Sequence, residues 1–199
     1  MIPARSPLLC IWVLLIAVVS ILVAGCGFPL VSRHIQGTTY TPHPRIAVLP
    51  FENYTDQDLV SAKVTEYVQS TMTARAAFTM VESGTTFEAL RRLRIRSALV
   101  LRRGQIDSLA QALEADYLLA GSVLEYREIG DKFLDKIPQV SINARLVDCK
   151  SGATVWTGVS NDSGDRTEFL FGIGAVQSAD ELSRKMVESM VTDIEKLFR

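Results

Sequence analysis

The sequence predicts an α/β sandwich in which helices pack against a mixed β-sheet. Three observations predict this class. Short apolar runs alternate with stretches of helical periodicity, a region with a period of two follows, and an amphipathic stretch closes the chain. The expected order is therefore strand, helix, strand, two helices, strand, hairpin and helix.

The first strand is expected at residues 45–51, an apolar run that Pro50 interrupts. Asp58 is a good N-cap for a helix that should extend to about Ala76, because apolar residues then recur at helical spacing. A second short strand is expected at residues 78–81.

Two more helices should follow before the sheet continues. Thr86 is expected to cap the first of them, with Phe87 turned inward, and residues 105–113 should form the second. The residues between them, 97–101, fit either a continued helix or a loop. Residues 117–126 begin as an unbroken apolar run, which is typical of a strand buried on both faces.

An antiparallel hairpin and a long helix complete the expected domain. Residues 140–147 alternate apolar and polar side chains, and residues 154–159 should return as their partner strand. Gly152 can take a positive φ in the turn between them, where Cys149 is expected to be a structural thiol. The last helix should begin after Ser178, with Glu181 completing a capping box.

The N-terminal region has the pattern of a secretory signal peptide. Arg5 precedes an apolar run from Leu8 to Val23, and small residues follow it. An uncleaved transmembrane helix is the alternative, although the run is slightly short for a span and no basic cluster follows it. The closing residues Leu22-Val23-Ala24-Gly25-Cys26 resemble a bacterial lipoprotein lipobox, in which the cysteine is acylated and becomes the first mature residue.

This pattern predicts three regions. Residues 1–25 are the signal peptide, residues 26–44 hold the lipidated Cys26 and a flexible tether rich in Gly and Pro, and residues 45–199 form one folded domain. Gly27 directly after Cys26 fits sorting to the outer membrane.

The residue types present discourage catalysis and metal binding. His34 and His43 are the only histidines in the chain, and both lie in the expected tether. Without a histidine in the domain, neither a Ser-His-Asp site nor a zinc site can be built there. The net charge of −1 gives no sign of a nucleic-acid partner. We therefore expect no enzyme, no cofactor and no metal.

A basic cluster and an aromatic segment are the candidate contact residues. The cluster contains Arg91, Arg92, Arg94, Arg96, Arg102 and Arg103, and residues 164–176 contain Phe169 and Phe171. The arginines fit an ordinary solvated surface, or a surface that binds anionic lipid headgroups, an acidic partner or a neighbouring subunit.

Three segments resemble the curli-transport lipoprotein (CsgG) family, which includes LpoB-like activators of penicillin-binding proteins and has a relative in the first domain of TolB. Residues 45–53 (RIAVLPFEN) resemble its opening strand, and residues 115–123 (ADYLLAGSV) resemble a central strand. Residues 144–148 (ARLVD), with Gly152 and Val155-Trp156, resemble its hairpin. The resemblance implies an α/β periplasmic domain.

Curli channels also insert two membrane-spanning hairpins, whose strands need roughly 9–11 residues each. The corresponding segments here, residues 129–138 and 164–176, are too short, and the first is charged. We therefore expect no transmembrane barrel hairpins.

Together these features predict a non-catalytic outer-membrane lipoprotein, anchored at the periplasmic face. Its domain should bind protein partners in envelope assembly, secretion or the regulation of peptidoglycan synthases. A subunit of an oligomeric curli-type secretion channel is the alternative, and a homo-oligomer fits either function.

Overall fold

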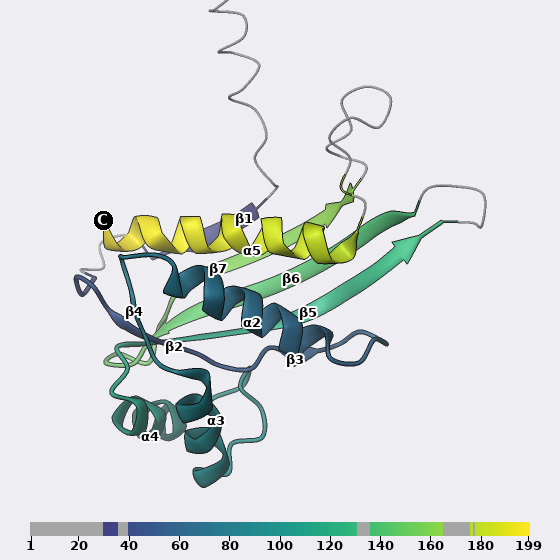
Figure 1. The fold of residues 1–199 in the computed structure, drawn as a ribbon. Helices are drawn as coiled ribbons and strands as arrows, with labels where there is room; N and C mark the ends of the chain where they lie inside the picture. The colour runs from purple at the N-terminus through teal and green to yellow at the C-terminus, as the bar shows by residue number, and fades with distance from the viewer. Residues whose placement is uncertain (1–29, 36–39, 131–135, 165–175, 177) are drawn as a thin grey trace, which may run out of the picture.

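The computed structural model describes residues 30–35, 40–130, 136–164, 176 and 178–199 (Figure 1). They form a seven-stranded mixed sheet of order β1-β7-β6-β5-β2-β4, with β3 also pairing to β5. The strands are β1 (Leu30–His34), β2 (Arg45–Val48), β3 (Glu52–Asn53), β4 (Thr79–Met80), β5 (Tyr117–Ile129), β6 (Ile137–Asp148) and β7 (Thr154–Ser163). The helices are α2 (Val60–Thr73), α3 (Ser83–Arg92), α4 (Arg103–Leu113), α5 (Ala179–Glu195) and the short 3-10 helix η2 (Lys196–Phe198). The expected fold class is confirmed.

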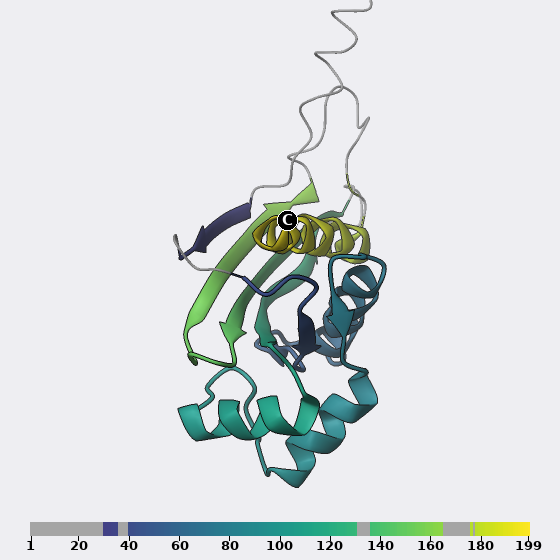
Figure 2. The same cartoon turned by 90° about the vertical axis from the view of Figure 1, so that its left-hand side faces the viewer.

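Helices cover both faces of the sheet, but not to the same extent. Alternate strand residues point to opposite faces, so neighbours such as Ile46 and Ala47 belong to two separate hydrophobic clusters. The larger cluster lies under α2 and α5, and the smaller one lies under α3 and α4. Figures 1 and 2 show α3 and α4 together at one end of the molecule, away from α5. In the described residues, the rest of this second face carries no helix.

The expected hairpin is the longest antiparallel part of the sheet. β6 pairs with β7 from Gln139↔Ser163 to Val147↔Thr154. Gly152 has φ +72° in the turn, and the Asp148 carboxylate accepts hydrogen bonds from the backbone of Lys150 and Ser151. A glycine was expected to allow this turn, and its positive φ confirms that expectation.

Ser178 caps the start of α5, as the sequence indicates. Of the two hydrogen bonds of a capping box, the one accepted by the Ser178 side chain is formed. Ser178 Oγ accepts from the backbone N–H of Glu181 at 3.2 Å. The Glu181 carboxylate lies 2.8 Å from Lys185 Nζ one turn later, so it forms an ion pair along the helix.

The prediction of a flexible tether over residues 26–44 was wrong for residues 30–34. They form β1, which pairs antiparallel to β7 from Leu30↔Ser160 to His34↔Trp156. Four of the five side chains are exposed, so β1 is an edge strand without an apolar face of its own. Its position comes from backbone pairing with β7, and side-chain periodicity therefore could not reveal it.

Three local expectations for the helices were also wrong. α2 begins at Val60 after Leu59, whose φ is +64°, so Asp58 is not its cap. α3 begins at Ser83, which places Thr86 inside the helix, where its Oγ donates to the Glu82 carbonyl. Phe87 is 55% exposed and does not enter the core. Residues 97–101 form a loop and do not continue α3.

Within the described ranges, none of the helices is both long and apolar enough to cross a bilayer. The apolar run from Leu8 to Val23 and the proposed anchor Cys26 lie outside the described residues, and so do the middle parts of the two short segments compared with channel hairpins.

Candidate functional site

The six arginines of the basic cluster all belong to one compact unit made of α3, α4 and the loop between them. Arg91 and Arg92 end α3, Arg94 and Arg96 lie in the loop, and Arg102 and Arg103 start α4. All six side chains are exposed. The fold therefore brings the predicted cluster together at the end of the molecule where α3 and α4 lie (Figure 2).

The loop that carries Arg94 and Arg96 is fixed at its start by α3 and by the smaller core cluster. Ile95 donates its backbone N–H to the Leu90 carbonyl at 3.0 Å, and Arg94 takes a left-handed φ of +55° to allow this. Ile95 and Ala98 are buried on α3 and α4. The arginines consequently project from an ordered support.

Two charged side chains of the sheet hold the other half of the loop. Glu52 Oε1 accepts from Ser97 Oγ at 2.5 Å and from the Leu99 N–H at 3.2 Å. Arg145 donates to the Leu99 carbonyl. Burial on its own would raise the pKa of Glu52, but hydrogen bonds from Ser97, Tyr54 and Leu99 and the charge of Arg145 outweigh it, and the pKa lies below its usual value. The carboxylate is therefore charged at neutral pH and keeps the loop in place.

The arginines differ in how well they are paired. Arg91 lies 3.3 Å from Glu88, and Arg103 lies 2.9 Å from Asp107 and also donates to the Lys150 carbonyl. Within the described part of the chain, Arg92, Arg94, Arg96 and Arg102 have no acidic side chain at ion-pair distance. Four guanidinium groups are thus available to a partner. Arginine is the residue best suited to form bidentate hydrogen bonds with a carboxylate.

Two exposed apolar side chains accompany these arginines, and the sequence analysis placed neither of them on the surface. Phe87 is 55% exposed on α3, and Val100 is 75% exposed in the loop. Protein interfaces are enriched in aromatic residues and arginine. We call the six arginines with Phe87 and Val100 the arginine-rich surface. The alternative helical face Thr86, Ala89 and Leu90, at spacings of three and four residues, is the signal in the sequence that could have placed Phe87 outside.

Phe169 and Phe171 lie outside the described residues, but the two ends of their segment are described. The backbone N–H of Val176 donates to the Gly164 carbonyl at 3.2 Å, directly after the end of β7. Arg103 contacts Lys150, before the start of β7. The arginines and the ends of this segment therefore lie at opposite ends of the same strand, and they do not form one continuous surface there.

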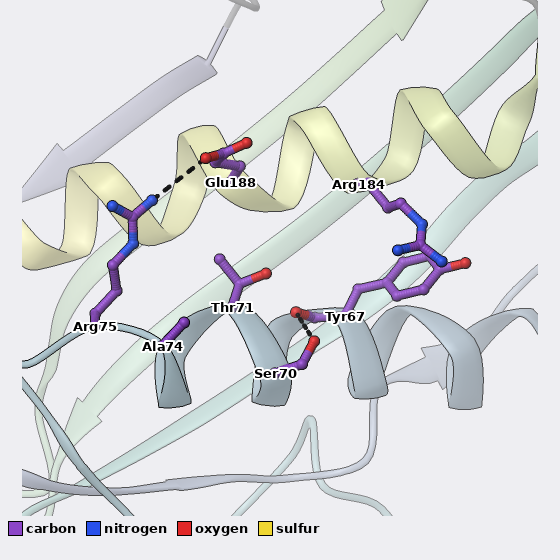
Figure 3. A pocket seen from close by; sticks show the side chains of 7 residues that line it. All are labelled: Tyr67, Ser70, Thr71, Ala74, Arg75, Arg184 and Glu188. Carbon is purple, nitrogen blue, oxygen red and sulfur yellow. Dashed lines mark hydrogen bonds and ion pairs between the residues drawn. The ribbon is translucent and has the colours of Figure 1, made fainter.

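A second depression lies between α2 and α5, and Figure 3 shows its side chains. This groove has a volume of about 390 Å³. Arg184 from α5 lies over the Tyr67 ring at 4.2 Å, and Arg75, just after the end of α2, pairs with Glu188 at 3.5 Å. The cation–π contact and the ion pair both run between the α2 segment and α5, and they link the two helices.

The described residues were also compared with what a metal site or a reactive cysteine requires. No group of three His, Cys, Asp or Glu side chains there could hold a metal ion. Cys149 is buried, and burial raises the pKa of its thiol to about 12, so the thiol stays protonated. This agrees with a structural thiol.

The sequence of this chain matches one family model over most of its length. The model is described as "Peptidoglycan-synthase activator LpoB", and it matches residues 18–161 of the 199. This chain belongs to the LpoB family. The match bears out the LpoB-like part of the resemblance, whereas the curli (CsgG) part and the channel alternative stay predictions. No curated protein matches the chain significantly in sequence.

Several solved structures share the fold of this chain at low sequence identity. The PelC dodecamer from Paraburkholderia phytofirmans is 18% identical, with a TM-score of 0.56 over 84% of this chain and 98% of PelC. CT253 from Chlamydia trachomatis is 11% identical, with a TM-score of 0.54 over 78% of this chain and 97% of CT253. Lipoprotein GNA1162 from Neisseria meningitidis is 21% identical, with a TM-score of 0.50 over 77% of this chain and 99% of GNA1162. These similarities show that the LpoB-family chain shares their fold.

Proposed function

We propose that this chain is a lipid-anchored envelope protein that activates a peptidoglycan synthase by binding to it. The family match carries the proposal, because its model describes activators of peptidoglycan synthases. In this function the chain catalyses no reaction, and the chemistry takes place in the synthase.

The proposed anchor is an acylated Cys26 in the outer membrane, with the domain on the periplasmic side. The lipobox-like residues Leu22–Cys26 support it. Each buried methylene of an acyl chain contributes about 0.8 kcal/mol, so several chains on one cysteine give a stable attachment.

The proposed binding site is the arginine-rich surface, and its partner should present an acidic patch. Four of its arginines have no ion pair within the described part of the chain, and the Glu52 and Arg145 contacts already hold their loop in position. A preordered basic surface speeds association with an acidic partner and needs little loop ordering on binding. Phe169 and Phe171 remain a proposed second contact.

The test is glycan polymerisation by a purified peptidoglycan synthase from the same cell, with and without the acylated protein in detergent. We expect the protein to raise the polymerisation rate several-fold. A variant with Arg92, Arg94, Arg96 and Arg102 replaced by glutamate should lose most of this activation. Its fold should persist, because each exposed substitution changes stability by about 0.5 kcal/mol or less.

A matched control reverses four exposed cations elsewhere. Replacing Arg33, Arg127, Lys136 and Lys196 by glutamate changes the net charge equally, and activation should be kept. If the unmodified protein activates none of the cell's synthases, the proposed function is wrong. If the first variant activates fully, the function can stand but the arginine-rich surface is not the binding site.

A further inference from the structure

Glu52 connects the arginine-rich surface to the loop between β3 and α2. Its carboxylate oxygen Oε1 accepts from Ser97 and Leu99, which belong to the loop between α3 and α4. The other oxygen, Oε2, accepts from the Tyr54 hydroxyl at 2.9 Å. Tyr54 is 59% exposed. Its ring therefore lies at the border of the arginine-rich surface, and a single carboxylate holds both loops.

The sheet places Leu124 next to Tyr54. β3 and β5 pair in parallel, and the Tyr54 N–H continues this pairing to the Val123 carbonyl at 2.9 Å. The register of β5 against β6 then shifts between Val123 and Glu125. Because Val123 and Tyr126 both belong to the larger core cluster, Leu124 and Glu125 between them both face away from it. Leu124 is 44% exposed as a result.

Beside these two apolar side chains lies a groove with a volume of about 450 Å³. We call it the Tyr54 groove, and its lining includes Tyr54, Asp56, Leu124, Glu125, Arg127 and Ser141. Arg127 lies 2.6 Å from Glu125 and donates to the Gln139 side chain at 3.1 Å, so these two charges compensate each other. Within the described ranges, Asp56 has no basic side chain at ion-pair distance. The groove thus offers an apolar pair and one uncompensated negative charge.

The loop that carries Tyr54 is held by its own side chains. Asn53 Nδ2 donates to the Gln57 carbonyl at 2.7 Å, and Asn53 Oδ1 accepts from the Thr55 N–H at 3.0 Å. The groove is therefore formed before a partner binds. An occupant loses little free energy to loop ordering, which favours binding.

The charges decide which part of a partner fits each feature. The arginine-rich surface favours carboxylates. In the groove, Asp56 would repel an acidic side chain, whereas an apolar side chain can remove the exposed surfaces of Tyr54 and Leu124 from water. Since Glu52 makes the two features continuous, one segment of a partner can cover both. Large apolar side chains seated in such pockets dominate the energetics of protein interfaces.

We propose that the Tyr54 groove receives a large apolar side chain of the peptidoglycan synthase, next to the synthase carboxylates that pair with the arginine-rich surface. This inference rests on the proposed function. It adds the chemistry of the partner's binding segment, in which acidic residues lie beside an exposed apolar anchor. It also extends the binding surface from α3 and α4 to β5 of the sheet.

The test measures the Kd between the full acylated protein in detergent and the purified synthase. Leu124→Arg and Tyr54→Ala should each raise the Kd about tenfold, the effect of losing one anchor contact. Tyr54→Phe keeps the ring and removes only the hydrogen bond to Glu52, so it should change the Kd by less than about threefold. Both positions are exposed, and the variants should unfold at the temperature of the unmodified protein. If Leu124→Arg does not fold, the two Tyr54 variants decide.

Val159→Arg is the matched control. Val159 is also 44% exposed, but it lies on β7, two strands away from β5 in the sheet. The control should change the Kd by less than about threefold. A loss equal to that of Leu124→Arg would overturn the inference, because an added charge anywhere on the sheet would then suffice.

The remaining outcomes separate this inference from the proposed function. If the unmodified protein binds none of the cell's synthases, the proposed function is wrong. If the glutamate variant of Arg92, Arg94, Arg96 and Arg102 loses binding while Leu124→Arg and Tyr54→Ala bind normally, only the groove inference is wrong. Normal synthase binding by Leu124→Arg together with lost self-association would show that a second copy of this chain occupies the groove, and this too would overturn the inference.

Discussion

Replacing Trp156 by alanine should lower the free energy of unfolding by about 3–5 kcal/mol, the usual loss for a large buried aromatic side chain. Trp156 is 1% exposed and lies in the larger core cluster under α5. Its indole lies against Gly158, where an added Cβ would come within 2.5 Å of the ring. Its Nε1–H also donates to Asp193 of α5 at 2.9 Å, so alanine would remove packing and a hydrogen bond together.

Urea unfolding followed by circular dichroism would measure this loss. Trp156→Phe should lose less, about 1.5–3 kcal/mol, because an aromatic ring stays in the core while the hydrogen bond to a charged acceptor is removed. A loss below about 1 kcal/mol for Trp156→Ala would contradict the described packing of α5 on β7.

Replacing Glu52 by alanine should have the next largest effect, about 1.5–3 kcal/mol of stability, and it should also weaken synthase activation. The substitution removes the acceptor for Ser97 and Leu99 and a negative charge that interacts with Arg145. The loop would detach while all its arginines remain in the sequence. Because the pKa of Glu52 is lowered in the folded state, its contribution to stability is complete at neutral pH. The contribution is lost only in acid, as the pH falls below the ordinary pKa of a glutamate carboxyl and through the lowered one.

Hydrogen exchange of the loop amides, together with the polymerisation assay, tests this prediction. Exchange at residues 95–101 should become faster, and the protein should remain folded. Glu88→Ala is the control, since Glu88 is exposed and forms its ion pair with Arg91 on the same helix. Equal effects of the two substitutions would show that the Glu52 contacts do not hold the loop.

The elements predicted correctly are those whose signal is local. Ser178 and the apolar face after it identify α5, and Gly152 between two alternating segments identifies the β6–β7 turn. In both, a cap or a turn residue and the side-chain period give the same answer. The buried strand at residues 117–126 was also predicted, although the structure extends it to Ile129.

The errors occurred where contacts distant in sequence decide the structure. β1 has no apolar periodicity, and its partner β7 lies more than a hundred residues away in the sequence. Phe87 was expected inward together with Leu90 and Leu93, because they recur at helical spacing. The face of α3 that packs on the sheet contains Thr86, Ala89 and Leu90 instead, and Phe87 lies beside it and is exposed.

The sequence predicted the arginines of the candidate site but not the contacts that hold them in place. The density of arginines between residues 91 and 103 indicated a basic surface, and the structure places them on one unit. The sequence could not show that Glu52 and Arg145, from two distant strands, hold the loop. Nor could it show that β1 shortens the tether, because that depends on a pairing across the whole domain.

Binding of a peptidoglycan synthase to the α3–α4 end of the domain is proposed above, and photocrosslinking in intact cells tests it most directly. A photoreactive amino acid would replace Val100, which is 75% exposed on the arginine-rich surface, or Thr157, which is exposed on β7. We predict a crosslinked product that contains a peptidoglycan synthase from position 100 and none from position 157. A synthase captured from position 157 alone, or only copies of this chain captured from position 100, would contradict the account.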